Sequence, residues 1–187
     1  MNELVFSCTD ALDQPTFPSC PTDYGQRPVK VLLMKEGGTI SASSGANPTA
    51  AEFQAAITSG EVIVIEGITN GNVVENSATE LSGDDTETGG TEKFDVYQRL
   101  SGRIKRFDET VKRALEKYTR FSNLRAWYIT DKNYCFGGTE GYWASPDFSY
   151  QTFEGVGQPT YINFMLDYLM SGADYANYDA DYDTLAN

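Results

Sequence analysis

The chain has 187 residues and a formal net charge of −13, with 27 acidic residues, 14 basic residues and no histidine. This length suits one domain with its own core, and the lack of histidine removes the commonest general base, Ser-His and Cys-His nucleophiles, and most zinc sites. Three widely spaced cysteines do not indicate a disulfide framework, and neither a signal peptide nor a membrane span of about 18 apolar residues is present, so we expect reduced thiols and no membrane contact.

The first 26 residues are broken by Pro15, Pro18 and Pro21 and show no hydrophobic period. This composition predicts an N-terminal arm over residues 1–26, which either lies over its own domain or reaches an adjacent subunit. A single β-rich domain is expected over residues 27–170, followed by an acidic, Tyr/Asp-rich tail over residues 171–187.

Residues 27–35 (RPVKVLLMK) form a short apolar run that predicts a buried strand. A helix follows, for which Thr49 is the expected N-cap and Glu52 completes a capping box. Gly60 stands where a glycine after the last helical turn is expected.

Residues 61–69 (EVIVIEGIT) predict the next strand, and Asn70-Gly71 predicts a type I′ hairpin turn into residues 72–75. Residues 77–92 have no apolar period and are rich in glycine and carboxylates, which predicts a long solvated loop. This loop is either a flexible hairpin tip or a segment that orders against a neighbouring subunit.

Residues 94–107 alternate, with Leu100 and Ile104 on one face and Arg99 and Arg103 on the other, which predicts a long strand. Asp108 then caps a predicted helix over residues 108–122. The apolar stripe of this helix has the spacing of a core-facing side and consists of Val111, Ala114, Leu115, Tyr118 and Phe121.

Further strands are expected at residues 124–130, 134–136 and 159–170, the last with apolar side chains on both faces. Between them we expect loops and one short strand near residues 150–154. Residues 174–187 show no core-forming pattern, which leaves a frayed terminus or a tail that docks onto the basic helix of a neighbour. The tally predicts a mainly β (α+β) fold, an antiparallel β-sandwich or partly closed barrel with one flanking helix and extended arms.

The basic residues are concentrated in one part of the chain. Nine of the 14 lie between Arg99 and Arg125, where only three acidic residues oppose them. A solvated helix face and electrostatic pairing between subunits both explain this cluster, and we prefer the pairing. The proposed basic residues are Arg99, Arg103, Lys105, Lys112, Arg113, Lys117 and Arg120. Their proposed acidic partners on another subunit are Asp84, Asp85, Glu87, Asp179, Asp181 and Asp183.

Other kinds of site fit the sequence poorly. The stretch from Asp179 to Asp183 resembles the opening of a calcium loop but lacks its glycine and its final carboxylate. No phosphate- or dinucleotide-binding glycine motif precedes a helix. Tyr97, Tyr118 and Trp127 lie among the basic residues as a nucleic-acid stacking platform requires, but the acidic remainder of the chain repels phosphate. We therefore predict no catalytic residue, no metal and no cofactor.

The order of elements resembles the tail-tube fold of bacteriophages over residues 61–107, 108–122 and 124–136. In that family a small β-sandwich with a flanking helix joins its sheet to those of its neighbours, which makes a ring around an inner barrel, and loops and arms connect successive rings. The acidic, Tyr/Asn/Asp-rich composition without histidine is similar to virion proteins of crAss-like phages that infect gut Bacteroidales.

The resemblance implies a non-enzymatic virion protein that assembles in the host cytoplasm: a ring-forming tail or neck (head-to-tail connector) subunit lining a conduit for DNA or ejected proteins. Its partners would be copies of itself and neighbouring ring, portal or tail proteins, with non-specific passage of DNA. One alternative is a monomeric carbohydrate- or protein-binding module that uses Tyr142, Trp143, Phe148 and Tyr150. Another is a carboxylate-based hydrolase.

Overall fold

The computed structural model describes residues 27–35, 37–40, 47–82, 91–105, 107–119, 123–151, 161–169 and 176–186. The predicted arm over residues 1–26 lies outside this part of the chain, as do Asp84, Asp85, Glu87 and Arg120. The strands are β1 (Pro28–Lys35), β2 (Val62–Ile65), β3 (Ile68–Ser82), β4 (Thr91–Ile104), β5 (Leu124–Thr130), β6 (Tyr134–Phe136), β7 (Tyr142–Gln151), β8 (Tyr161–Leu169) and β9 (Asn177–Tyr178). The helices are α1 (Ala50–Thr58), α2 (Glu109–Tyr118) and the 3-10 turn η2 (Ala180–Thr184).

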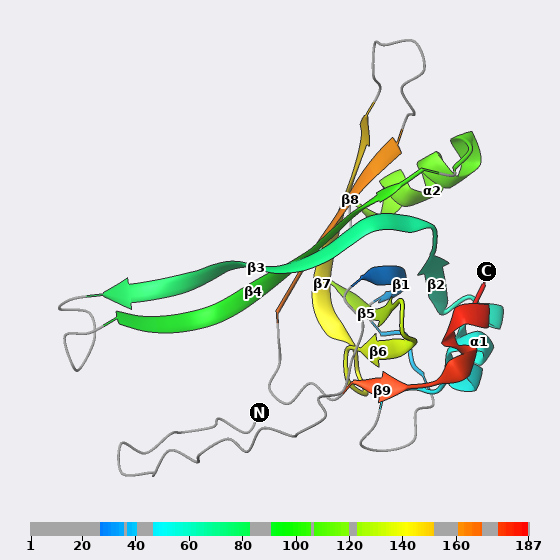
Figure 1. Ribbon diagram of the computed structural model, residues 1–187, viewed down its shortest axis with the longest axis horizontal. Helices are drawn as coiled ribbons and strands as arrows, with labels where there is room; N and C mark the ends of the chain where they lie inside the picture. Colours follow the sequence, from blue (N-terminus) through cyan, green and yellow to red (C-terminus); the bar gives the residue numbers. More distant parts are fainter. Residues whose placement is uncertain are drawn as a thin grey trace.

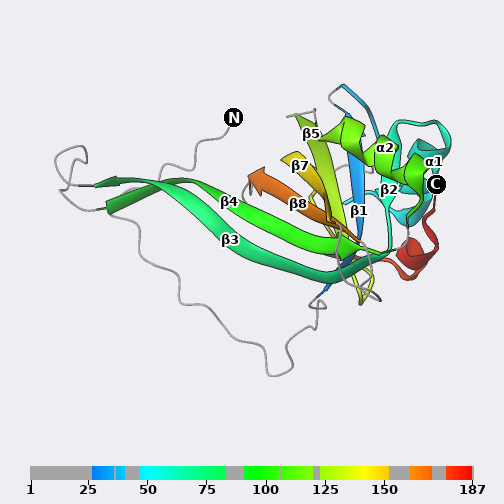
Figure 2. The same cartoon turned by 90° about the horizontal axis from the view of Figure 1, so that it is seen from above.

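All described strands belong to one antiparallel sheet in the order β2-β1-β5-β7-β8-β4-β3, with β6 paired to β5 and β9 paired to β6. The sheet is curved, and β3 and β4 extend away from the rest of it as a long ribbon (Figures 1 and 2). Strands β2 and β3 stand at the two ends of the order, so the sheet is not closed into a barrel. The predicted mainly β, antiparallel architecture with a flanking helix is confirmed.

The sheet buries apolar side chains on both faces, because successive residues of a strand point to opposite sides. In β1, Val31 and Leu33 join the core that β4, β7 and β8 enclose, whereas Leu32 and Met34 join a second core. Helix α1 and the turn η2 cover that second core (Figure 1). The prediction of a single flanking helix is therefore incomplete: α1 covers one side, and α2 packs its Leu115 on the other.

Both helices begin where the sequence predicts. The Thr49 hydroxyl accepts a hydrogen bond from the Glu52 amide at 3.3 Å, and the Glu52 carboxylate accepts one from the Thr49 amide at 2.7 Å, which confirms the capping box. The Asp108 carboxylate accepts a hydrogen bond from the Val111 amide at 2.8 Å. Gly60 follows α1 with φ at +77°, the left-handed conformation expected after a helix.

The predicted hairpin turn at Asn70-Gly71 is wrong. Asn70 has the positive φ (56°) that the turn requires, but β3 continues through it, and the shift of pairing register between Thr69 and Asn72 marks a bulge. A Cβ on Gly71 would stand 2.2 Å from the Pro28 carbonyl oxygen, so this glycine lets β3 pass close to the start of β1. Gly71 does not share the positive φ that a type I′ turn also requires, and tertiary packing carries the strand past this point.

The predicted loop over residues 77–92 is strand at both ends. β3 runs to Ser82 and β4 begins at Thr91, with Leu81 opposite Glu92 in the ladder. These residues are mostly polar and lack hydrophobic alternation, so their sequence does not indicate a strand.

The loops predicted around Tyr142, with a short strand near residues 150–154, are also wrong. Strand β7 occupies Tyr142–Gln151 and pairs with both β5 and β8. Pro146 lies within β7 opposite Leu166, on the side of the sheet that faces the core. The segment was interpreted as loops because it is rich in glycine and aromatic residues, and Pro146 also disfavours a strand assignment from sequence.

The C-terminal segment has a core-forming role that its sequence pattern does not reveal. Tyr182 and Leu185 are buried, and the Tyr182 hydroxyl donates a hydrogen bond to the Pro48 carbonyl at 2.6 Å. The Lys30 ammonium group donates to the carbonyl oxygens of Leu185 (2.8 Å) and Asp183. Over residues 176–186 the expectation of a tail without core contacts is therefore wrong, because two apolar side chains suffice to anchor the segment beside α1.

Alkaline pH should destabilise this region. Burial raises the pKa of the Cys135 thiol and of the Tyr182 phenol above their ordinary values. An unfolded cysteine titrates near about pH 8.5 and an unfolded tyrosine near about pH 10, so above those values only the unfolded chain loses these protons. The stabilisation from the two buried groups is fully present below about pH 8.5. Above the pH at which each group titrates in the unfolded chain, that group should lower the free energy of unfolding by up to about 1.4 kcal/mol per pH unit.

Urea unfolding at about pH 7.5 and about pH 9.5 measures this slope, because the unfolded thiol titrates between them. Cys135→Ala should show a shallower decline than the unaltered protein, since it removes one of the two groups. Identical slopes for the two proteins would contradict the assignment to Cys135.

Candidate intersubunit surfaces

The ribbon of β3 and β4 projects beyond the sheet. The ladder between β4 and β8 ends at the pair Tyr97–Leu169, whereas the ladder between β3 and β4 continues to the pair Ser82–Thr91. The residues of β4 before Tyr97 span about 20 Å at the usual rise per residue. Along this length the described strands form only a two-stranded ribbon, and such a ribbon is marginally stable alone in water. Its free edges suit the addition of a strand from another chain.

The outer face of β4, β7 and β8 is mainly polar, although Trp143, Met165 and Leu169 also lie on it. Arg99, Ser101 and Arg103 of β4 stand opposite Asp167, Met165 and Asn163 of β8. On β7, Ser145, Asp147 and Ser149 stand opposite the same β8 residues and share this face. The face thus carries two arginines and two aspartates, and its net charge is balanced.

Arg99 has its partner within the chain. Its guanidinium donates to the two Asp167 carboxylate oxygens at 2.6 and 2.7 Å, a bidentate ion pair that is about one-third exposed. The hydrogen bond to Asp167 raises the pKa of Arg99 above its ordinary value. Arg103 lies over the Tyr161 ring at 4.6 Å. Arg99 and Arg103 therefore belong to the face of the sheet and are not part of the basic group on α2.

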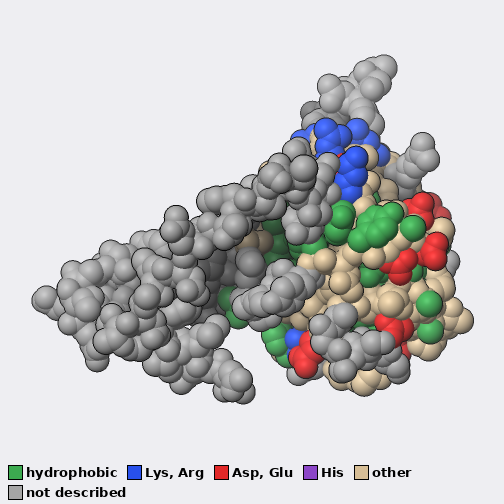
Figure 3. Space-filling view, turned by 60° about the horizontal axis from the view of Figure 1, so that its bottom comes forward, with side chains coloured by type: hydrophobic (Ala, Val, Ile, Leu, Met, Phe, Trp, Pro, Cys, Tyr) green, Lys and Arg blue, Asp and Glu red, His purple; other side chains and the backbone are tan. Residues whose placement is uncertain are grey.

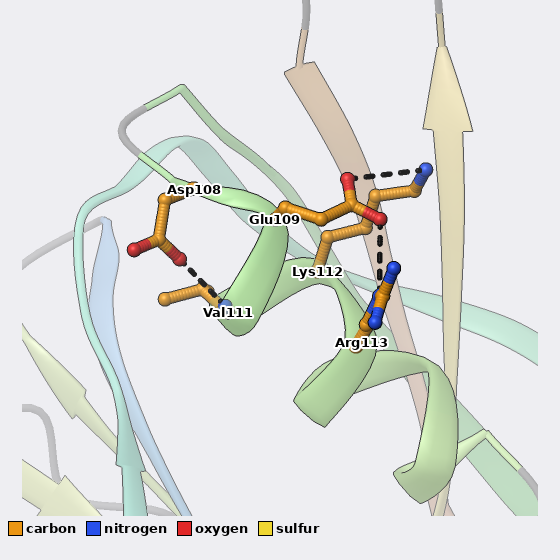
Figure 4. A network of polar contacts seen from close by, with 5 residues as sticks. All are labelled: Asp108, Glu109, Val111, Lys112 and Arg113. Carbon is orange, nitrogen blue, oxygen red and sulfur yellow. Dashed lines mark hydrogen bonds and ion pairs between the residues drawn. The ribbon is translucent and has the colours of Figure 1, made fainter.

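Three other members of the predicted basic patch, Lys112, Arg113 and Lys117, lie on helix α2, and Lys105 lies just after β4. Lys112 and Arg113 both lie near the Glu109 carboxylate, at 3.9 and 3.2 Å (Figure 4). Lys112 also lies over the Tyr150 ring, with its Nζ 4.4 Å from the ring centroid. Lys105 and Lys117 are exposed. Exposed pairs of this kind are worth little in solution, so the three basic side chains of α2, which also carries Glu109 and Glu116, can still pair with an acidic partner.

The predicted acidic partners are not equivalent. The Asp179 carboxylate accepts hydrogen bonds from the amides of Ala50 and Asp181, both at 3.0 Å, which fixes the start of α1 against η2. Asp179 is therefore used within its own chain. Asp181 and Asp183 are exposed on η2. The structure does not bring any of these three carboxylates to the α2 of the same chain.

The sequence analysis missed a groove between α2 and the end of β2. It has a volume of about 500 Å³ and is lined by residues 63–67, Ile104, Val111, Ala114, Leu115 and Tyr118. Four of these belong to the stripe of α2 that was predicted to face the core, yet Val111 is 40% exposed and Ala114 is exposed. The apolar stripe in the sequence indicates where the groove lies. Only the tertiary packing shows that Val111 and Ala114 of this stripe are exposed.

No family model and no curated protein matches the chain. A solved structure of the tail of an empty GTA particle, computed with helical refinement in C6 symmetry, is similar at 14% identity and a TM-score of 0.39. The similarity covers 66% of this chain and 90% of that chain. A likeness at this level does not assign a family, and the function proposed below is argued from the surfaces of this chain.

The four aromatic side chains predicted to form a binding platform do not share a surface. Tyr142 and Phe148 are buried, while Trp143 and Tyr150 are 44% and 39% exposed. Trp143 and Tyr150 have opposite parity on β7 and therefore point to opposite faces of the sheet. Arg125 lies over the Trp143 ring at 3.6 Å, and Phe107 packs edge-on against Tyr150. The predicted platform is wrong.

The described residues contain no group of three or more His, Cys, Asp or Glu side chains placed to hold a metal ion. Within the same residues, no helix has the length and apolar character that crossing a membrane requires.

Proposed function

We propose that this chain is a ring-forming structural subunit of a phage tail or neck, which lines a conduit for DNA or ejected proteins. The projecting ribbon of β3 and β4 carries the proposal. It presents strand edges beyond its own sheet, where two strands alone gain little stability, so a neighbouring copy is the partner that would complete it. Copies joined head to tail in this way form a closed ring when the rotation between them closes.

The polar face of β4, β7 and β8 supports the conduit role. A protein holds DNA through cations that replace the counterions of its phosphates. On this face Arg99 is paired to Asp167 and two aspartates balance the two arginines. A wall of this composition would let a polyanion pass without retaining it.

Basic helix α2 would then set the register between copies. Charges at the rim of an interface contribute more to association rate and specificity than to affinity, and they are screened by salt. The proposed contacts are those of Lys112, Arg113 and Lys117 with carboxylates of a neighbour. The acidic candidates that the structure leaves accessible are Asp181 and Asp183.

The mass of the purified protein in solution, measured by light scattering at low and high salt, tests the proposal. An oligomer of ring size, seen as rings by electron microscopy, is the expected result, with a smaller mass at high salt because rim charges are screened. A protein that stays monomeric at every salt concentration, and also with tail or neck proteins added, would overturn it.

Reversing the charge of α2 should abolish assembly and leave the monomer folded. The variant combines Lys112→Glu, Arg113→Glu and Lys117→Glu, three positions whose side chains lie outside the core. Like charges facing each other across an interface cost several kcal/mol, so we expect the dissociation constant to rise at least about 100-fold. Light scattering measures the assembly, and far-UV circular dichroism measures the fold.

The control variant combines Lys35→Glu and Lys132→Glu, which make the protein more acidic at exposed positions away from α2. It should assemble normally. Normal assembly of the α2 variant would show instead that the basic cluster is a solvated helix face.

A further inference from the structure

The groove beside α2 has the chemistry of a binding site for an extended segment. Its helix wall consists of Val111, Ala114, Leu115 and Tyr118, and its strand wall consists of residues 63–67 with Ile104 behind them. Apart from Glu66, the side chains lining it are apolar or aromatic. Val111 and Ala114 remain exposed although they belong to an amphipathic stripe. An apolar surface of this kind, bordered by polar residues, is typical of an interaction site.

Charge selects the kind of segment that fits. Lys and Arg side chains gather beside a hydrophobic patch on one face of the molecule (Figure 3). On the helix that forms one wall of the groove, Lys112, Arg113 and Lys117 supply basic groups. A segment with neighbouring apolar side chains and nearby carboxylates would fill the groove and pair with the basic helix.

Residues 1–26 of the chain have this chemistry. They contain four acidic residues and no basic residue, and Glu3 directly precedes the apolar run Leu4-Val5-Phe6. A stretch of this length reaches up to about 90 Å when extended, which is enough to reach a neighbouring copy. The C-terminal segment is excluded, because Tyr182 and Leu185 are buried beside α1 on the other face of the sheet.

We infer that the groove between α2 and β2 binds the N-terminal segment, residues 1–26, of a neighbouring copy, with its apolar run in the groove and its carboxylates facing α2. The inference rests on the proposed function, because it requires copies to lie side by side. It adds a second contact between copies, independent of the strand edges of the ribbon. It also explains the exposure of Val111 and Ala114 on the amphipathic stripe of α2.

Photocrosslinking of the full chain tests this inference. A benzophenone amino acid replaces Phe6, and the protein is mixed with an equal amount of isotopically heavy protein before irradiation. Mass spectrometry then identifies the crosslinked peptides, and light scattering on the same sample gives the mass. The expected result is an oligomer whose crosslinks join light and heavy chains and fall on residues 63–67 or on α2.

Two single substitutions in the first turn of α2 sharpen the test. Val111→Glu places a charge in the groove and should lower the yield of these crosslinks at least about tenfold, since a carboxylate is costly to bury. Thr110→Glu adds the same charge at the adjacent position, which is exposed and does not line the groove, and should change the yield less than about twofold. Circular dichroism confirms that both proteins are folded.

The outcomes separate the inference from the proposed function. An oligomer whose crosslinks lie within one chain, lie outside the groove or are equally reduced by both substitutions overturns this inference alone. A protein that remains monomeric under all conditions overturns the proposed function, and the inference with it.

Discussion

Shortening the ribbon of β3 and β4 will convert the assembled protein into a folded monomer. The variant replaces residues 78–96 with Asn-Gly, so that Ser77 and Tyr97, which face each other in the ladder, are joined by a two-residue hairpin turn. The body of the sheet keeps all eight pairs between β4 and β8, from Tyr97–Leu169 to Ile104–Ile162. What is removed is the part of the ribbon that no third described strand supports.

Loss of this ribbon removes the strand edges that we propose to join copies. We expect the dissociation constant of the assembly to rise at least about 100-fold, because a strand-to-strand contact contributes several backbone hydrogen bonds of about 1 kcal/mol each. Light scattering measures the mass, and the urea midpoint measures the stability of the body, which should change little. The control replaces only Thr86, Thr88, Gly89 and Gly90 with serine, which keeps the proposed partners Asp84, Asp85 and Glu87, and it should assemble. A shortened protein that keeps its full mass would show that copies meet elsewhere.

Replacing Trp127 by alanine will destabilise the fold by about 4 kcal/mol. Trp127 is 1% exposed, packs edge-on against Phe53 at 5.4 Å, and donates its Nε1 hydrogen to the Gly138 carbonyl at 2.8 Å. A Cβ on Gly137 or Gly141 would stand within 3 Å of its ring, so the loop after β6 is fitted closely to this side chain. Truncation leaves a cavity and an unpaired carbonyl, and both costs add.

Trp143→Ala is the matched control, because it removes the same side chain from an exposed site. Trp143 is 44% exposed and contacts Arg125 through a cation–π interaction. We expect it to cost less than about 1 kcal/mol. Urea unfolding monitored by circular dichroism at equal protein concentration gives both values. Equal losses for the two tryptophans would contradict the burial on which the prediction rests.

Local signals in the sequence predicted the beginnings of the helices reliably. A cap is formed by residues three apart, so Thr49 with Glu52, and Asp108 with the Val111 amide, need no distant partner. Strand β1 was also predicted correctly, since the consecutive apolar residues Val31, Leu32, Leu33 and Met34 are buried on both faces of the sheet. The alternation of Leu100 and Ile104 with Arg99 and Arg103 likewise predicted which face of β4 is buried.

The errors share one physical cause, which is that strand length and strand ends depend on the neighbours. Asn70 takes the conformation its type favours, yet β3 continues because β4 extends alongside it. Pro146 is accepted within β7 because the ladder with β5 ends at Ala144, so only β8 pairs with β7 at this proline. Tyr182 and Leu185 are buried only because α1 lies beside the end of the chain.

The candidate surfaces show the same contrast between what local sequence patterns predict and what distant neighbours decide. The sequence alone determined that the protein is mainly β, acidic and without histidine, that its basic residues are concentrated around one helix, and that this helix is amphipathic. Only the tertiary structure decided that Arg99 is paired to Asp167, that Asp179 caps α1, that the stripe of α2 stays open as a groove, and that β3 and β4 project beyond the sheet. Composition and period are properties of neighbouring residues, whereas pairing and exposure depend on which distant segments the folded chain brings together.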